Sequence, residues 1–97
     1  MPYEDELKSL SNTIRQSVID ELAKQPMSVR ELTSKIEVSQ PVMSQHLKVL
    51  KDAGLVDVHP AGTRNIYHIN KGKLDEIRAF WTAHWSSLLT SIDEQKE

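Results

Sequence analysis

The sequence predicts a mainly helical α+β protein with one small β-hairpin, in the order of four helices, two strands and a final helix. Three observations support this prediction. Two short amphipathic segments separated by a tight turn occupy residues 28–53, two alternating apolar segments follow between residues 55 and 70, and an apolar stripe runs through residues 71–93. Because the chain has 97 residues, we expect a single domain over residues 1–97.

The first two helices are indicated by their ends and by the spacing of apolar residues. Leu7 and Leu10 lie three positions apart behind a run of acidic residues, which is typical of a short helix. Asn12 is a suitable N-cap for a second helix that runs to about Lys24. This helix must end there because the residue before a proline, here Pro26, disfavours helical backbone.

A pair of helices is expected over residues 28–53. Ser28 and Glu31 have the spacing of a capping box, which predicts the start of a short helix. After a tight turn, Ser39 can cap the next helix, and Gly54 supplies the left-handed residue that ends it. Helix, short turn and helix in this order form the layout of a helix-turn-helix.

Two strands are expected directly after this pair. Residues 55–60 place Val56 and Val58 on one face, and residues 63–70 alternate in the same way. The tripeptide Pro60-Ala61-Gly62 is expected to form the turn between them. A hairpin in this position is the wing of a winged helix-turn-helix.

The last helix is expected over about residues 71–93. Its apolar stripe is too wide and too aromatic to face solvent. We expect the stripe and the first helix to form the seam of a homodimer, and a ligand pocket lined by the aromatic residues is the alternative. The residues expected at the dimer interface are Leu7, Ile77, Phe80, Trp81, Trp85, Leu88 and Ile92.

The second helix of the pair has an unusual surface. Met43, Leu47 and Leu50 repeat at helical spacing and are expected to face the core. The rest is rich in Ser, Gln and Lys, and it contains no acidic residue before Asp52. Gln pairs with adenine, Ser donates or accepts at several bases, and Lys suits guanine or phosphate. We therefore interpret this helix as a DNA-recognition helix, and an ordinary polar solvent face is the alternative.

The expected DNA-binding residues lie on this helix and beside the hairpin turn. They are Ser39, Gln40, Pro41, Val42, Ser44, Gln45, His46, Lys48, Thr63 and Arg64. His46 borders the core stripe, so a packed boundary histidine is the alternative to a DNA contact. Lys48 is expected at a phosphate, whereas Lys51 lies one turn too far along. Arg64 is expected at a phosphate or in a minor groove, as an alternative to a solvated loop residue.

The distribution of charge supports a polyanionic partner for the middle of the chain. The formal net charge is −2, but residues 28–73 contain seven basic and four acidic side chains, and the acidic excess lies in the two flanks. The local field governs the approach of a polyanion, so the middle is where DNA is expected to dock.

Composition excludes several other classes. The chain has no cysteine, which excludes disulfides and thiolate metal sites. No secretory signal or membrane-length apolar run is present, so a soluble cytoplasmic protein without membrane contact is expected. No catalytic motif or glycine-rich phosphate loop appears, and we expect no enzyme activity and no cofactor.

The sequence MSVRELTSKIEVSQPVMSQHLKVLKDAGLV, followed by AGTRNIYHIN, resembles the ArsR-type winged helix-turn-helix repressors of prokaryotes. The resemblance covers about residues 7–92 and departs from the family at Thr13 and Ile14, where proline and threonine are usual. It implies a homodimeric, operator-binding repressor that often responds to a metal or another inducer. The motifs that carry it are Ser39-Gln40-Pro41, Ser44-Gln45-His46-Leu47, Leu50 with Ala53-Gly54-Leu55, and Gly62 with Arg64 and Tyr67.

The metal ligands of responsive relatives are not expected here. The resemblance implies that such ligands would be cysteines in residues 28–36 or a carboxylate–histidine set on the last helix. This chain has no cysteine, and Asp75 and His84 are nine residues apart, about 13 Å of helix rise, too far to share one ion. The four histidines are expected to lie apart in the fold. Control of the repressor is therefore expected to come from its expression level, an organic effector or a protein partner.

Two function hypotheses follow. The first is a homodimeric repressor that binds double-stranded DNA at a palindromic operator. The second is a winged-helix protein-interaction module that does not bind DNA specifically. The overall acidic balance of the chain leaves this alternative open.

Overall fold

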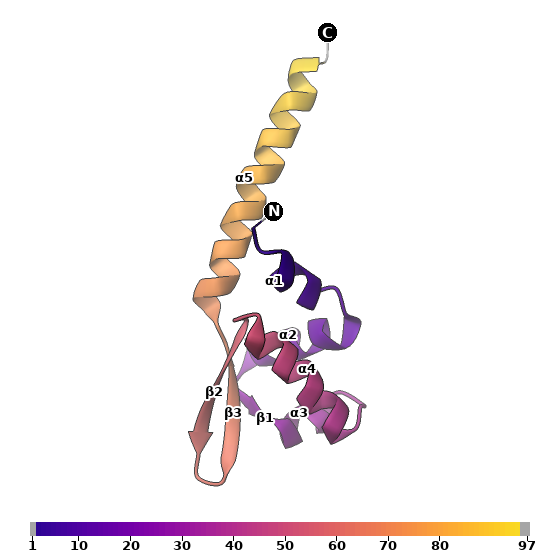
Figure 1. The fold of residues 1–97 in the computed structure, drawn as a ribbon, viewed down its shortest axis with the longest axis vertical. Coiled ribbons are helices and arrows are strands. Elements are labelled where there is room, and N and C mark those ends of the chain that lie inside the picture. The colour runs from indigo at the N-terminus through magenta and orange to yellow at the C-terminus, as the bar shows by residue number, and fades with distance from the viewer. Residues whose placement is uncertain (1, 96–97) are drawn as a thin grey trace.

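The computed structural model describes residues 2–95. It confirms the predicted fold class, a mainly helical α+β protein. A small body of helices and strands lies at one end, and the last helix extends from it (Figure 1), so the molecule measures 62 × 24 × 22 Å. The elements are α1 (Glu4–Ser9), α2 (Thr13–Lys24), β1 (Met27–Ser28), α3 (Val29–Lys35), α4 (Gln40–Asp52), β2 (Val56–Ala61), β3 (Arg64–Ile69) and α5 (Lys71–Gln95). No described helix is both long and apolar enough to cross a membrane.

The predicted helix caps are confirmed. The Asn12 side chain accepts hydrogen bonds from the backbone N–H groups of Ile14 and Arg15, at 2.9 and 3.1 Å. The capping box at the start of α3 is complete, because Ser28 Oγ accepts from the Glu31 N–H and the Glu31 carboxylate accepts from the Ser28 N–H. Each cap satisfies backbone donors that a helix start leaves without partners.

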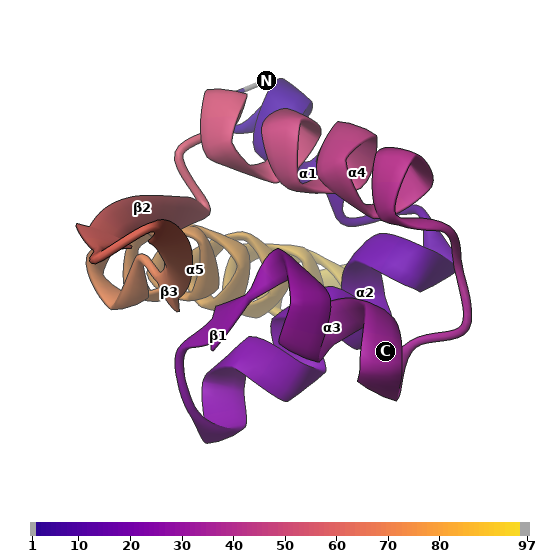
Figure 2. The same ribbon diagram turned by 90° about the horizontal axis from the view of Figure 1, so that it is seen from below.

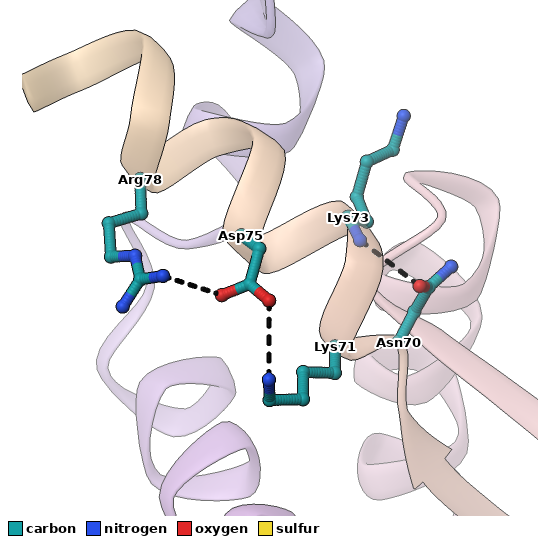
Figure 3. A network of polar contacts seen from close by, with 5 residues as sticks. All are labelled: Asn70, Lys71, Lys73, Asp75 and Arg78. Carbon is teal, nitrogen blue, oxygen red and sulfur yellow. Dashed lines mark hydrogen bonds and ion pairs between the residues drawn. The ribbon is translucent and has the colours of Figure 1, made fainter. Parts of the chain in front are cut away.

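The same device fixes the start of α5. Asn70 Oδ1 accepts from the Lys73 N–H at 3.1 Å, and Asp75 binds the side chains of Lys71 and Arg78 at 3.3 and 3.1 Å (Figure 3). Asn70 also donates its own N–H to the Leu55 carbonyl. These bonds set the direction in which α5 leaves the sheet.

The sheet has three strands, in the order β1-β3-β2, and not the two that the sequence predicted. Met27 pairs with Tyr67 and Ser28 with Ile66, both antiparallel. A strand of two residues is too short to show an alternating pattern. It forms because Ser28, as an N-cap, has the extended backbone that a strand requires.

The predicted position of the hairpin turn is wrong, because the turn lies closer to β3 than expected. Pro60 and Ala61 belong to β2, and Ala61 pairs with Arg64, so the loop is Gly62-Thr63. Gly62 has a φ of 65°, as the first central position of a type II′ turn requires. Proline is tolerated in β2 because this strand lies at the edge of the sheet.

The core lies between the helix pair, α2, the sheet and the start of α5. Met43, Leu47 and Leu50 are fully buried, which confirms the predicted inner face of α4. Ile77 is only 6% exposed and belongs to the same cluster. We expected Ile77 at a dimer interface, but α5 starts close enough to the body that this residue packs within its own chain.

Candidate nucleic-acid interface

The face of α4 opposite the core is open to solvent. Burial of the Met43–Leu47–Leu50 stripe leaves the intervening positions on the outside of the helix. Val42 is 38% exposed, and the neighbouring polar residues are exposed as well. The residues of α4 that lie exposed as predicted are Gln40, Pro41, Val42, Ser44, Gln45 and Lys48, with Ser39 exposed at the cap.

The Lys48 ammonium has a partner within its own helix. Its Nζ lies 2.8 Å from Asp52 Oδ2, and this hydrogen bond and the charge of Asp52 raise the pKa of Lys48. Both side chains are exposed, so the ion pair contributes little to stability and exchanges easily. Lys48 therefore stays positively charged, and a DNA phosphate can replace Asp52 as its partner.

His46 lies at the edge of the exposed face and is half-buried. Its Nδ1 is 3.1 Å from Nη1 of Arg15, a residue of α2. Burial and the charge of Arg15 both lower the pKa of His46 from its ordinary value of 6.5. The histidine is thus packed against the body on one side, as the boundary interpretation expected.

A polar hollow lies between the hairpin and the helix pair. Figure 2 shows the elements that carry its lining residues, β1, α3, α4 and β3, from below. The volume of the hollow is about 320 Å³, and it brings together three predicted residues, Gln40, Thr63 and Arg64. The structure adds a second arginine, Arg30, from the first turn of α3. The full lining is Ser28, Val29, Arg30, Gln40, Thr63, Arg64 and Asn65.

Arg30 is the functional candidate that sequence reasoning missed. It is one of the seven basic residues of the middle segment, but the local sequence pattern at residues 28–31 predicts only a capping box. The signal that identifies it is its spatial position beside Arg64, on an element far away in sequence. Two exposed guanidinium groups with amide and hydroxyl neighbours suit the phosphate oxygens of a nucleic-acid backbone.

The histidines are less scattered than expected. His59 and His68 lie on neighbouring strands with ring centroids 4.6 Å apart and planes at 89°. This edge-to-face contact is a ring-packing geometry. Within residues 2–95, no group of three or more metal-ligating side chains comes together.

Asp75 and His84 of α5 contact different partners. The two oxygens of Asp75 bind Lys71 and Arg78 (Figure 3), whereas the ring of His84 stacks on Phe80 with the planes at 3°. The structure therefore does not bring Asp75 and His84 together.

The residues expected at a dimer seam fall into two groups. Leu7 and Trp81 pack against the core, and Phe80 contacts the ring of Tyr3 at 5.5 Å. Beyond them α5 leaves the body (Figure 1). The apolar side chains on this part of the helix are exposed to solvent. The exposed fractions are 55% for Trp85, 41% for Leu88, 57% for Leu89 and 54% for Ile92.

Comparison with known proteins identifies the family. The family model described as "Bacterial regulatory protein, arsR family" matches residues 12–58, which include the helix pair. The HTH-type transcriptional regulator Rv2034 of Mycobacterium tuberculosis is 40% identical over 83 residues, covering 86% of this chain and 78% of the relative. The chain belongs to the ArsR family. The predicted resemblance is thereby confirmed.

Two further comparisons concern the sequence and the fold. The HTH-type transcriptional repressor SmtB of Mycobacterium tuberculosis is 33% identical over 78 residues, and the match spans 80% of this chain and 58% of that repressor. The solved structure of an ArsR-like transcriptional regulator from Rhodococcus sp. RHA1 superposes with a TM-score of 0.82. The superposition covers 98% of this chain and 92% of the Rhodococcus chain. At 23% sequence identity, this comparison shows that the two proteins share a fold.

Membership of the ArsR family settles the broad class of activity. The chain is a DNA-binding transcriptional regulator. Proteins of this family are not enzymes, so the prediction of no catalytic activity is confirmed.

Proposed function

We propose that this ArsR-family protein is a homodimeric repressor that binds a palindromic operator in the cytoplasm, with α4 in the major groove. The observation that carries the proposal is the exposed face of α4, which presents Ser44, Gln45 and Lys48 beside a hollow lined by two arginines. Amide and hydroxyl groups read base edges, and the arginines hold the backbone. A repressing role is supported by the relative SmtB, which is named as a repressor.

The dimer is proposed from the continuity of one stripe. Leu74, Ile77 and Trp81 of α5 pack on the body of their own chain. The same side of the helix continues as Trp85, Leu88 and Ile92, which are 41–55% exposed. An apolar row of this length on a protruding helix is stable in water when a second copy covers it.

Two-fold symmetry of the dimer predicts the spacing of the two half-sites in the operator. An isologous dimer presents two copies of α4 to two half-sites. Their centres lie about 34 Å apart when one turn of DNA separates them. The operator is accordingly expected to be an inverted repeat with half-sites about ten base pairs apart.

Selection from fragmented genomic DNA tests the proposed function. The purified chain is expected to retain a small set of fragments that share an inverted repeat. Retention of no fragment, or of fragments without a common sequence, would favour the protein-interaction module.

The arginines of the hollow are expected to make phosphate contacts. Arg64→Ala or Arg30→Ala removes two contacts per dimer, so affinity should fall for operator and random DNA alike. The slope of log affinity against log salt should become shallower by about 1.8. Fluorescence anisotropy at several salt concentrations measures both quantities.

Lys35→Ala is the matched control, because it removes the same charge from the far end of α3, outside the hollow. It should leave the slope close to that of the wild type. A loss confined to the operator in Arg64→Ala would place this arginine at a base instead of a phosphate.

Metal ions are expected to leave operator affinity unchanged. The chain has no sulfur ligand of the thiolate type, and both oxygens of Asp75 are held by cations. Titration of the protein–operator complex with zinc, copper or arsenite at micromolar concentration checks this. Release of the operator, or zinc that survives dialysis in stoichiometric amount, would contradict it.

A further inference from the structure

Arg15 contacts three parts of the chain, and the function proposed above gives this residue no role. Its backbone N–H is fixed by the Asn12 cap at the start of α2. Its Nε donates to the Ser9 carbonyl at the end of α1, and its Nη1 lies 3.1 Å from His46 Nδ1 on α4. Arg15 and His46 are both half-buried, so solvent does not freely replace this contact.

The chemistry of the two groups determines the state of the imidazole. A guanidinium has only N–H donors and stays protonated in proteins. The contact is therefore a hydrogen bond only if His46 Nδ1 carries a lone pair. The ring must then be neutral, with its single proton on Nε2.

We infer that Arg15 is a positioning residue of the DNA interface: it holds His46 as the neutral ring protonated at Nε2, so that the recognition helix offers an N–H donor to DNA. The acceptor is a phosphate oxygen or a base-edge acceptor beside the groups that Gln45 reaches. The inference rests on the proposed function, because it assigns a partner to one atom of the proposed DNA-binding face.

Charges of both signs surround His46. Besides Arg15, the nearby hollow between α1 and α4 is lined by Asp5 and Lys8 of α1 and Asp52 of α4. Protonation of His46 would place two cationic donors 3.1 Å apart. Burial and the Arg15 charge lower the pKa of His46, so the neutral ring predominates at pH 7.

The tautomer can be measured without any substitution. Long-range ¹H–¹⁵N correlation spectra of the free protein at pH 7 should show a lone-pair nitrogen at Nδ1 and a protonated nitrogen at Nε2 of His46. In Arg15→Met the pKa of His46 should move up, because a neighbouring positive charge is lost. A cationic ring, or a proton on Nδ1 in the wild type, would overturn the inference.

Two substitutions of His46 separate the two ring nitrogens. A glutamine places its amide nitrogen near the position of Nε2 and keeps the outward donor. An asparagine reaches only the position of Nδ1, where its oxygen can accept from Arg15, and it loses the outward donor. His46→Gln should bind the selected duplex within about threefold of the wild type, whereas His46→Asn should lose roughly tenfold or more.

The outcomes distinguish this inference from the function on which it rests. Wild-type affinity in both variants, with both folded by circular dichroism, would show that His46 only packs. If the proposed function fails, the wild type itself will bind no selected duplex. A loss in His46→Gln as large as that in His46→Asn would also overturn the assignment of a donor at Nε2.

Discussion

Replacing Trp85 by glutamate is expected to convert the protein into a monomer and to lower its operator affinity by roughly 10²–10⁴-fold. Trp85 is 55% exposed in the single chain, so the substitution leaves the core intact. In the proposed dimer the same position is covered by the partner, and a buried carboxylate without a partner is strongly unfavourable. Each monomer would then hold one half-site, without the gain that comes from linking two.

Light scattering at micromolar concentration and anisotropy with the selected duplex measure the two effects of Trp85→Glu. Ala83→Glu is the matched control, because Ala83 is exposed on the side of α5 away from the apolar stripe. It should remain dimeric. A wild type with the mass of one chain, or a dimeric Trp85→Glu variant, would contradict the proposed seam.

Replacing Gln45 by alanine is expected to weaken operator binding by about 1–3 kcal/mol. Gln45 is exposed on α4. Its amide has no hydrogen-bond partner among the described side chains, so no such bond gives Gln45 a structural role. Alanine is the better helix former, so the free energy of unfolding should not fall. The loss should be specific, with affinity for random DNA almost unchanged.

Lys48→Ala is expected to behave differently from Gln45→Ala. The lysine contacts a phosphate in the proposed complex, so operator and random DNA should both bind more weakly, with a shallower salt slope. Lys51→Ala, one turn further along the exposed side of α4, serves as its control. Equal operator affinity of wild type and Gln45→Ala, or a changed sequence preference in Lys48→Ala, would show that the roles are misassigned.

Much of the fold is predictable from the sequence because its determinants are local. The caps at Asn12 and Ser28 act within three residues, and the spacing of Met43, Leu47 and Leu50 repeats within one helix. Such patterns depend on neighbouring residues alone. The exposed face of α4 follows directly, since burial of one side of a helix exposes the other.

The features that the sequence did not predict depend on contacts between distant segments. β1 exists because Met27 meets Tyr67, and Ile77 is buried because α5 begins against the body. Arg30 becomes a site candidate only beside the hairpin, and Arg15 meets His46 across 31 residues of sequence. Local propensity contains no information about such pairs.

The salt dependence of operator affinity tests the central claim most directly. If two protomers each place Arg30 and Arg64 on phosphates, four contacts give a log–log slope of about −3.6, and further contacts make it steeper. The account predicts a straight line at least this steep for the selected inverted repeat, with two chains bound per duplex. A flat dependence, or one chain per duplex at full occupancy, would contradict a dimeric operator-binding protein.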